Sequence, residues 1–352
     1  MPINVAIRVD ASADMGVGHL MRCVALAQGF HAAGCSITFL TNAAAGASLA
    51  QRQDCPFDVR VIDPTNLQAT EALLTQLMPD ILVVDGYHFT VPALQRLYRF
   101  CALAVFVDDV IHPGVGVCDV VLNTSPVAQA SDYAAFVPSS SVQLLGTRYC
   151  LLRPEFERLT PTDVSDRKKL VISFGGSDPA GYTYPLLAGL QQSPLVNVPV
   201  LILAGAHYAS VNALHDLART LPHCEVLINC QTMSAALGEA RMAISAAGST
   251  AFELAATGTP GLLVSVAENQ IRLGEFFAQQ GCSLHWRGND PNDREVIVDT
   301  ALQAACRLWN DDDQLQQMQR AALRLGLANG AKIAAQQLLD ILRQRNDAKT
   351  LS

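Results

Sequence analysis

Short apolar runs alternate with helical patterns along the first half of the chain. Residues 3–9 form an apolar run that only Asn4 and Arg8 interrupt, and this run predicts a strand. The next segment predicts a helix, because one face of it carries Leu20, Val24, Ala27 and Phe30. Further strands are expected at residues 36–40, 58–62, 81–84, 103–107 and 120–122, and helices at 68–77 and 91–100. Continuous apolar strands separated by helices are typical of a parallel sheet that is covered on both faces.

The alternation stops at residues 146–169 and then starts again. This segment contains Pro154 and Pro161, mixed charge and no sustained period, which indicates a connection between domains. Beyond it, strands are expected at residues 170–174, 200–203, 225–228, 242–245 and 261–264, and residues 311–345 have a helical pattern. The sequence therefore predicts two Rossmann-like α/β domains, residues 1–150 and 169–325, followed by a C-terminal helix and tail at 326–352.

A glycine-bearing loop joins the first strand to the first helix and contains Gly16, Gly18 and then His19. In open α/β folds, such a loop holds ligands, particularly phosphates, on the N–H groups of the helix N-terminus. The helix dipole disfavours a charged imidazole there, so we expect His19 to be neutral near pH 7 and able to accept a proton. A lone histidine more often caps a helix or fills a gap, but the flanking glycines favour a catalytic role.

The same loop does not match a dinucleotide site. Met21 stands where the G-x-G-x-x-G motif needs its third glycine. The next strand ends in Thr41 and Asn42, whereas a dinucleotide site has an acid there to bind the ribose. We therefore exclude nicotinamide and flavin cofactors.

Polar residues also follow two later strands. One strand is followed by Asp85-Gly86-Tyr87-His88 and the next by Asp108-Asp109. Isolated acids at such places are explained by helix caps and loop turns, whereas two acidic loops at one edge of a sheet would line one side of a ligand-binding site. The sequence leaves both interpretations open.

The first strand of the second domain is followed by a loop that contains Gly176 and Ser177. A later strand leads into Ala246-Ala247-Gly248-Ser249-Thr250 and a helix. Its small residues allow a diphosphate to approach backbone N–H groups, and its hydroxyls add donors. Glu253 lies about one turn into that helix, where a carboxylate can accept both hydroxyls of a ribose. A capping box between Ser249 or Thr250 and Glu253 fits the spacing equally well.

Asn269 and Gln270 follow the next strand of the second domain. Their side-chain amides can donate and accept hydrogen bonds with sugar hydroxyls or N-acetyl groups. A surface loop would also contain such residues, so the sequence allows both interpretations.

Composition limits the class of partner. The chain has 352 residues, a formal net charge of −8 and no basic run, which argues against nucleic acid or an anionic membrane surface as partner. No apolar segment approaches the roughly 18 residues that a membrane span requires, and the N-terminus does not resemble a signal peptide. Ten cysteines without a C-x-x-C pair fit reduced thiols in the cytoplasm. The eight histidines show no zinc-site spacing, so no metal is expected.

Several motifs together resemble one family of enzymes. The matching segments are Asp10-Ala11-Ser12, Gly16-Val17-Gly18-His19, Met21-Arg22, Val84-Asp85-Gly86-Tyr87, residues 152–156, residues 174–178, and Ser245 through Gln270. In this order they resemble the nucleotide-sugar hydrolases of pseudaminic acid biosynthesis, which act on UDP-2,4-diacetamido-2,4,6-trideoxy-beta-L-altropyranose. The sequence departs from the family at Ala246, where paired glycines are usual, and at Glu268, where the family has Asp.

The resemblance implies a GT-B fold, in which two doubly wound Rossmann-like domains face a central cleft. It also implies that the nucleotide rests on the C-terminal domain and that the sugar faces the N-terminal one. By this resemblance His19 is the general base, Tyr87 faces the sugar, Glu253 binds the uridine ribose and Asn269 contacts the substrate. We expect the remaining substrate contacts at Gly16, Gly18, Arg22, Gly176, Ser177, Ser249, Thr250 and Gln270.

The expected reaction is hydrolysis of a UDP-linked diacetamido-trideoxyhexose without a metal or cofactor. Water would attack the anomeric carbon while His19 takes its proton. A glycosyltransferase of the same fold, related to MurG, is one alternative, and a non-catalytic sugar-nucleotide-binding protein is another. The absence of a basic or apolar docking run in this acidic sequence favours hydrolysis over transfer to a membrane-bound acceptor. The sequence leaves the oligomeric state open.

Overall fold

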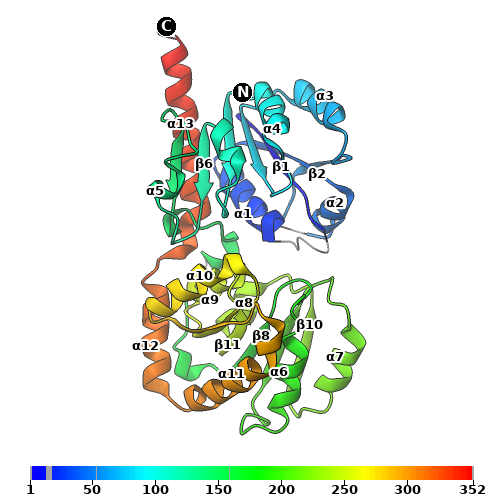
Figure 1. The fold of residues 1–352 in the computed structure, drawn as a ribbon, viewed down its shortest axis with the longest axis vertical. Coiled ribbons are helices and arrows are strands. Elements are labelled where there is room, and N and C mark those ends of the chain that lie inside the picture. Colours follow the sequence, from blue (N-terminus) through cyan, green and yellow to red (C-terminus); the bar gives the residue numbers. More distant parts are fainter. Residues whose placement is uncertain (1, 13–17, 53, 158, 351–352) are drawn as a thin grey trace. The chain divides into compact units, whose positions relative to one another are not determined.

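The computed structural model describes residues 2–12, 18–52, 54–157 and 159–350. It divides into two compact units (Figure 1). The N-terminal unit comprises Met1–Pro154 together with Ala328–Ser352, and the C-terminal unit comprises Glu155–Leu327. The chain therefore returns to its first unit after completing the second.

A parallel sheet forms the centre of the N-terminal unit. In the described part of this unit it has seven strands, in the order β3-β2-β1-β4-β5-β6-β7. They are β1 (Asn4–Val9), β2 (Ser36–Thr41), β3 (Asp58–Val61), β4 (Ile81–Asp85), β5 (Leu103–Val107), β6 (Val120–Asn123) and β7 (Val142–Leu145). The six strands expected from apolar runs are confirmed within two residues at each end. The short, half-exposed β7 at the sheet edge has no continuous apolar run and was not expected.

Helices cover both faces of this sheet. They are α1 (Gly18–Ala32), α2 (Ala43–Ala50), α3 (Leu67–Leu77), α4 (Val91–Leu97), α5 (Ala130–Tyr133) and α13 (Gly330–Thr350). Because successive side chains of a strand point to opposite faces, Ile7 of β1 packs with α1 and α13, whereas Ala6 packs with α3 and α4. Asn42, Asn66 and Thr90 cap α2, α3 and α4 by accepting backbone N–H groups.

The C-terminal helix α13 packs against α1. Ala334, Ala335 and Leu338 are buried in the same core as α1. The contact is close, because a Cβ added to Gly29 of α1 would lie 2.7 Å from the carbonyl oxygen of Ala331. Residues 311–345, which the sequence predicts as helical, form two helices that belong to different units, α12 (Asp312–Leu323) and α13.

The described part of the C-terminal unit contains a second parallel sheet of six strands, in the order β10-β9-β8-β11-β12-β13. They are β8 (Lys169–Ser173), β9 (Val200–Ala204), β10 (Cys224–Ile228), β11 (Ala240–Ala246), β12 (Gly261–Ser265) and β13 (Ser283–Arg287). The helices of this unit are α6 (Thr183–Leu190), α7 (Val211–Ala218), α8 (Met233–Gly238), α9 (Ser249–Thr257), α10 (Glu268–Gln279), α11 (Arg294–Trp309) and α12. Among the strands of this unit, β13 is the one that the sequence analysis did not expect; it is half-buried and contains His285 and Arg287.

Short 3-10 helices complete the described secondary structure, at Tyr98–Phe100, Pro113–Val117, Thr147–Tyr149, Pro154–Phe156, Val164–Asp166, Pro291–Asp293 and Leu327–Asn329. Three of them lie in residues 146–169, the segment that the sequence predicts to connect the domains.

Strand order creates one switch point in each sheet. From β1 the chain builds β2 and β3 on one side and then returns to place β4 on the other side. From β8 it builds β9 and β10 on one side and then places β11 on the other. In open α/β sheets, ligands bind beyond the carboxyl ends of the strands at such switch points. A ligand site is therefore expected at the loops after β1 and β4, and at those after β8 and β11.

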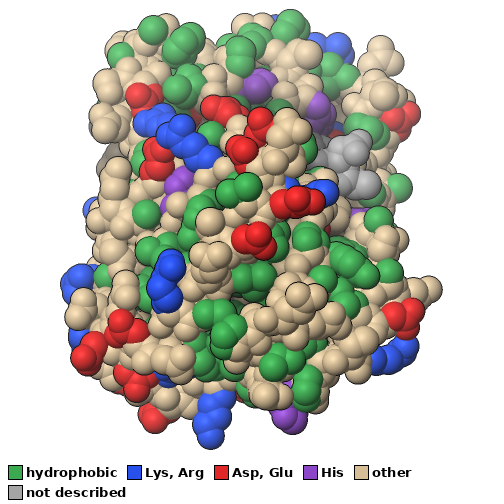
Figure 2. Space-filling model, turned by 60° about the horizontal axis from the view of Figure 1, so that its bottom comes forward, with side chains coloured by type: hydrophobic (Ala, Val, Ile, Leu, Met, Phe, Trp, Pro, Cys, Tyr) green, Lys and Arg blue, Asp and Glu red, His purple; other side chains and the backbone are tan. Residues whose placement is uncertain are grey.

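The surface carries no concentrated positive charge on the face drawn in Figure 2. Over its described residues, Lys and Arg side chains lie scattered among Asp, Glu and apolar side chains. Within the described helices, none combines the length and the apolar character that crossing a membrane would require.

Candidate active site

His19 and Asp85 form a hydrogen-bonded pair at the switch point of the N-terminal sheet. His19 is the second residue of α1, and Asp85 is the last residue of β4. His19 Nδ1 lies 2.7 Å from Asp85 Oδ1, and both side chains are buried. Arg22 Nη2 also lies 3.0 Å from the same Nδ1. Because an ionised carboxylate can only accept, the shorter contact with Asp85 places the proton on Nδ1, and in the neutral ring Nε2 then carries the lone pair. The arrangement fixes the tautomer in which Nε2 is the proton acceptor.

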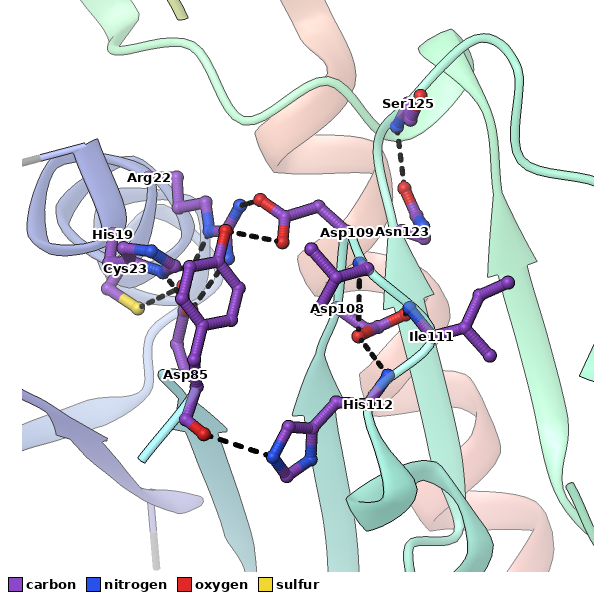
Figure 3. Close-up of polar contacts among 12 residues, drawn as sticks. His19, Arg22, Cys23, Asp85, Asp108, Asp109, Ile111, His112, Asn123 and Ser125 are labelled. Carbon is purple, nitrogen blue, oxygen red and sulfur yellow. Dashed lines mark hydrogen bonds and ion pairs between the residues drawn. The ribbon is translucent and has the colours of Figure 1, made fainter. Parts of the chain in front are cut away.

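Arg22 holds the Asp85 carboxylate in its ionised form. Its Nε lies 2.6 Å from Asp85 Oδ2 and its Nη2 lies 2.7 Å from Oδ1. Burial alone would raise the pKa of Asp85, but the Arg22 guanidinium and the His19 contact bring that pKa well below its usual value. Arg22 Nη1 also donates to Asp109 Oδ2 at 2.8 Å. The guanidinium expected to bind substrate therefore joins two carboxylates of the chain itself (Figure 3).

Tyr87 is held over His19 by contacts at both ends of the residue. Its hydroxyl donates to Asp109 Oδ1 at 2.7 Å, and its ring meets the His19 ring edge to face, with 4.6 Å between centroids. Its carbonyl accepts a hydrogen bond from His112 Nε2 at 3.1 Å. The tautomer of His112 is set because its Nδ1 accepts the backbone N–H of Gly114 at 2.9 Å. Tyr87 as a whole residue is nevertheless exposed.

Asp108 and Asp109 have different roles. Asp108 is buried and accepts the backbone N–H groups of Ile111 and His112, at 2.9 and 3.0 Å, and the hydroxyl of Tyr133 at 2.6 Å. Asp108 therefore stabilises the turn after β5. Of the two interpretations that the sequence left open for this acid, a turn and a ligand site, the turn applies. Of these two acids, Asp109 is the one that faces Arg22 (Figure 3). Asp109 also accepts the hydrogen bond from the Tyr87 hydroxyl.

A second aspartate–histidine contact lies across the same pair of strands. Asp10, just after β1, binds Arg8 through both carboxylate oxygens at 2.6 and 2.7 Å, and His88 Nε2 lies 3.0 Å from Asp10 Oδ2. The backbone N–H of Asn42 donates to Asp10 at 2.7 Å. Burial raises the pKa of Asp10, but His88 and Arg8 together bring it well below its usual value. The loop after β4 is thereby tied to both β1 and β2.

The glycines of the first loop are only partly described. Gly16 lies outside the described residues. Gly18 is exposed, opens α1, and has nothing within 4 Å of an added Cβ.

In the C-terminal unit, the loop after β8 folds back on itself beside β9. Gly175 has a φ of +81°, and a Cβ on Gly205 would lie 2.3 Å from the Cα of Gly176. Asp178 accepts the backbone N–H groups of Tyr182 and Thr183 at 3.1 and 2.8 Å, which fixes the start of α6. Glycine is thus required at position 205 by the close approach of the Gly176 backbone, and Ser177 lies half-buried in the resulting turn.

The helix that carries Glu253 begins without a side-chain cap. Gly248 occupies the N-cap position of α9, followed by the exposed Ser249 and the buried Thr250. Because the N-cap residue is a glycine, the capping box that the spacing allowed between Ser249 or Thr250 and Glu253 is not formed. Glu253 lies half-buried one turn into the helix.

Gln270 brings the loop after β12 close to the start of α9. Its Oε1 accepts the backbone N–H of Val266 at 3.0 Å, and its Nε2 would lie 3.5 Å from a Cβ on Gly248. Asn269 is exposed at the first turn of α10. Since β8, β11 and β12 are neighbours in the sheet, the predicted nucleotide-binding residues of this unit follow three adjacent strands.

Asp85 and Asp109 are the residues of the N-terminal cluster to which sequence reasoning gave no individual role. The signal that could have found them is their position directly after two apolar strands. Among the described residues, no group of three or more His, Cys, Asp or Glu side chains is arranged to hold a metal ion.

Comparisons with known proteins agree with this architecture. No family model matches the chain. It is 25% identical over 289 residues to the spore coat polysaccharide biosynthesis protein SpsG of Bacillus subtilis, a match that covers 80% of this chain and 83% of that protein. It is 21% identical over 287 residues to the UDP-2,4-diacetamido-2,4,6-trideoxy-beta-L-altropyranose hydrolase of Campylobacter jejuni, covering 81% of this chain and all of that enzyme.

The fold is that of a known glycosyltransferase. The crystal structure of Acinetobacter baumannii MurG superposes with a TM-score of 0.65 at 18% identity, covering 96% of this chain and 100% of that one. Two parallel-sheet Rossmann-like units and this likeness confirm the predicted GT-B fold.

Proposed function

We propose that this protein hydrolyses a UDP-linked diacetamido-trideoxyhexose, UDP-2,4-diacetamido-2,4,6-trideoxy-beta-L-altropyranose, to the free sugar and UDP. The observation that carries the proposal is the His19–Asp85 contact, which leaves His19 Nε2 as a proton acceptor at a sheet switch point. The similarity to the Campylobacter jejuni hydrolase, over the full length of that enzyme, supports the substrate class.

In the proposed reaction, a water oxygen attacks the anomeric carbon of the sugar. The bond from that carbon to the diphosphate oxygen breaks, and UDP leaves with the bonding electron pair. His19 Nε2 takes a proton from the attacking water. The buried Asp85 carboxylate stabilises the positive charge that the imidazole acquires, and it holds the ring in place through Nδ1.

The C-terminal unit is proposed to bind UDP. Backbone N–H groups near Gly176, Ser177 and Ser249 would bind the diphosphate and stabilise its charge as the sugar leaves. The uncapped start of α9 supports this assignment, because its first N–H groups receive no side-chain cap from Gly248. Glu253 would accept hydrogen bonds from the ribose hydroxyls.

Three further groups of this unit complete the proposed nucleotide contacts. The Thr250 hydroxyl adds a donor at the start of α9. The side-chain amides of Asn269 and Gln270 would contact the substrate from the loop after β12.

Hydrolysis in water enriched in oxygen-18 tests this proposal. We expect UDP to be released from the named substrate without an added acceptor, and the released UDP to contain no oxygen-18, because water attacks carbon. Oxygen-18 in UDP would show attack at phosphorus, which leaves no role for a base beside the sugar. His19→Gln should lose this release of UDP, because it removes the proposed base. His31→Gln is the matched control that should keep it, since His31 lies on the same helix and is exposed.

Glycosyl transfer is the second candidate, favoured by the likeness to MurG over nearly the whole chain. A transferase would use an acceptor hydroxyl in place of water. It would release UDP from the same donor only when an acceptor is added, so the acceptor-free assay separates the two functions.

A further inference from the structure

The hydroxyl of Tyr87 has a defined direction. It donates its only proton to Asp109 Oδ1 at 2.7 Å, because a carboxylate can only accept. Asp109 is in turn fixed by Arg22, whose Nη1 donates to Oδ2 at 2.8 Å. Burial and the neighbouring Asp109 raise the pKa of Tyr87, so the phenol keeps its proton.

Because its proton is directed to Asp109, the same oxygen has only lone pairs for any other partner. The Tyr87 residue as a whole is exposed, while Asp109 is partly covered. The edge-to-face contact with His19, at 4.6 Å, restrains the Tyr87 ring. An oxygen held in this way can accept a hydrogen bond from a ligand but has no proton left to donate.

We propose that Asp109 determines the sugar specificity of the site by orienting the Tyr87 hydroxyl, so that Tyr87 accepts a hydrogen bond from an N–H or O–H group of the bound sugar. The inference rests on the proposed function, because it takes the ligand beside His19 to be a sugar. It extends that function by naming the chemical group that the site selects. An acylamino substituent satisfies the requirement through its N–H, whereas the matching O-acyl ester has no donor.

Arg22 makes the effect of Asp109→Asn predictable. The Arg22 guanidinium requires an acceptor, so the amide oxygen of the substituted side chain would face Arg22 and its NH₂ group would face Tyr87. The phenol oxygen would then accept from that NH₂ group, and its own proton would turn toward the ligand. The substitution should thus reverse the hydrogen-bonding preference of Tyr87 without removing the ring.

The experiment measures binding of two matched probes. Both are methylene-phosphonate analogues of the UDP-diacetamido sugar, which cannot be hydrolysed, and in one of them the acylamino N–H groups are replaced by ester oxygens. For the unmodified protein we expect the amide probe to bind roughly three- to tenfold more tightly, the range for one net hydrogen bond. Asp109→Asn should bring this ratio to one or below, and Tyr87→Phe should bring it to about one. Asp58→Asn, an exposed acid of the same unit, should leave the ratio unchanged.

Each other outcome overturns the inference. A ratio of one in the unmodified protein means that Tyr87 does not select a donor. If Tyr87→Phe abolishes the preference for the amide probe but Asp109→Asn leaves it unchanged, Asp109 does not orient the Tyr87 hydroxyl. If the double variant Asp109→Asn, Tyr87→Phe has a ratio of probe affinities that differs from that of Tyr87→Phe alone, Asp109 acts by another route. Failure of the proposed function gives a different result. The hydrolysable UDP-diacetamido sugar then stays intact, while the ratio of the two probe affinities still responds to these variants. Thermal unfolding confirms that each variant is folded.

Discussion

Arg22 meets Asp85 side-on, with Nε 2.6 Å from Oδ2 and Nη2 2.7 Å from Oδ1. This geometry is bidentate and therefore specific for a guanidinium. It keeps a fully buried carboxylate charged directly beside His19. The same arginine reaches Asp109, so one side chain fixes both the partner of His19 and the partner of Tyr87.

His19→Phe is expected to lower turnover by about 10²–10⁴-fold, the usual worth of a general base. UDP affinity should change by no more than a few fold, because the proposed UDP contacts lie in the C-terminal unit. Steady-state kinetics and calorimetric titration with UDP measure the two effects. Activity retained above about one per cent would exclude the base role.

Asp85→Asn is expected to lower kcat by between about 10²- and 10⁴-fold while KM changes little. An amide nitrogen facing His19 Nδ1 would favour the wrong tautomer, since the amide oxygen is needed by Arg22. Nitrogen-15 NMR of the His19 ring should show the proton moving from Nδ1 to Nε2. Unchanged kcat would mean that the His19–Asp85 contact is structural, and Asp58→Asn controls for loss of one negative charge.

Glu253→Ala is expected to weaken UDP binding by about 1.5–3 kcal/mol, the range for hydrogen bonds to a charged group. Thermal stability is measured beside UDP affinity, because loss of a purely structural role of Glu253 would lower the melting temperature instead. Titration with UDP and a thermal unfolding curve make the comparison. A lower melting temperature with unaltered UDP affinity would contradict the ribose contact, and Glu225→Ala, at an exposed position on β10, is the control.

Gly29→Ala should destabilise the N-terminal unit by about 1–3 kcal/mol, as overpacking does. The new methyl group would lie 2.7 Å from the carbonyl oxygen of Ala331, so α13 would have to move away from α1. Chemical unfolding measures the loss, and limited proteolysis should release α13 earlier. Gly238→Ala is a matched control, because among the described residues its added Cβ would meet just the Leu159 side chain, at 3.4 Å. Equal stability of the two variants would show that the α1–α13 contact is loose.

The free energy of unfolding should fall in acid, and part of this loss should come from Asp10. Its folded-state pKa lies well below its usual value, so its contribution is fully present above about pH 4, the ordinary pKa of Asp. As the pH drops below that value, the unfolded chain binds a proton that the folded chain does not, and the contribution is lost. Asp10→Asn should destabilise the protein at pH 7 by about 3–5 kcal/mol, because it leaves Arg8 buried without its partner. Unfolding at pH 7, 5 and 3 should show a smaller acid-induced drop in this variant; an equal drop would contradict the assignment.

The sequence alone determined the layered architecture. Strands such as β4 and β5 are buried along their whole length, because helices cover both faces of a parallel sheet. This burial makes their residues apolar without interruption, and a local pattern is enough to predict them. The same reasoning placed His19 at the start of a helix and the polar residues Asp85 and Asp109 beyond strand ends.

The tertiary structure decided which of these residues meet. His19 and Asp85 are 66 positions apart and come together because β4 pairs with β1 on the side opposite β2. No local pattern encodes that choice, since strand order depends on pairing between distant backbone segments. Only the folded loop shows that Asp108 turns into its own backbone while Asp109 faces Arg22. In the same way, the helical pattern of α13 could not show which unit would bury its apolar face, because that depends on the complementary surface of α1.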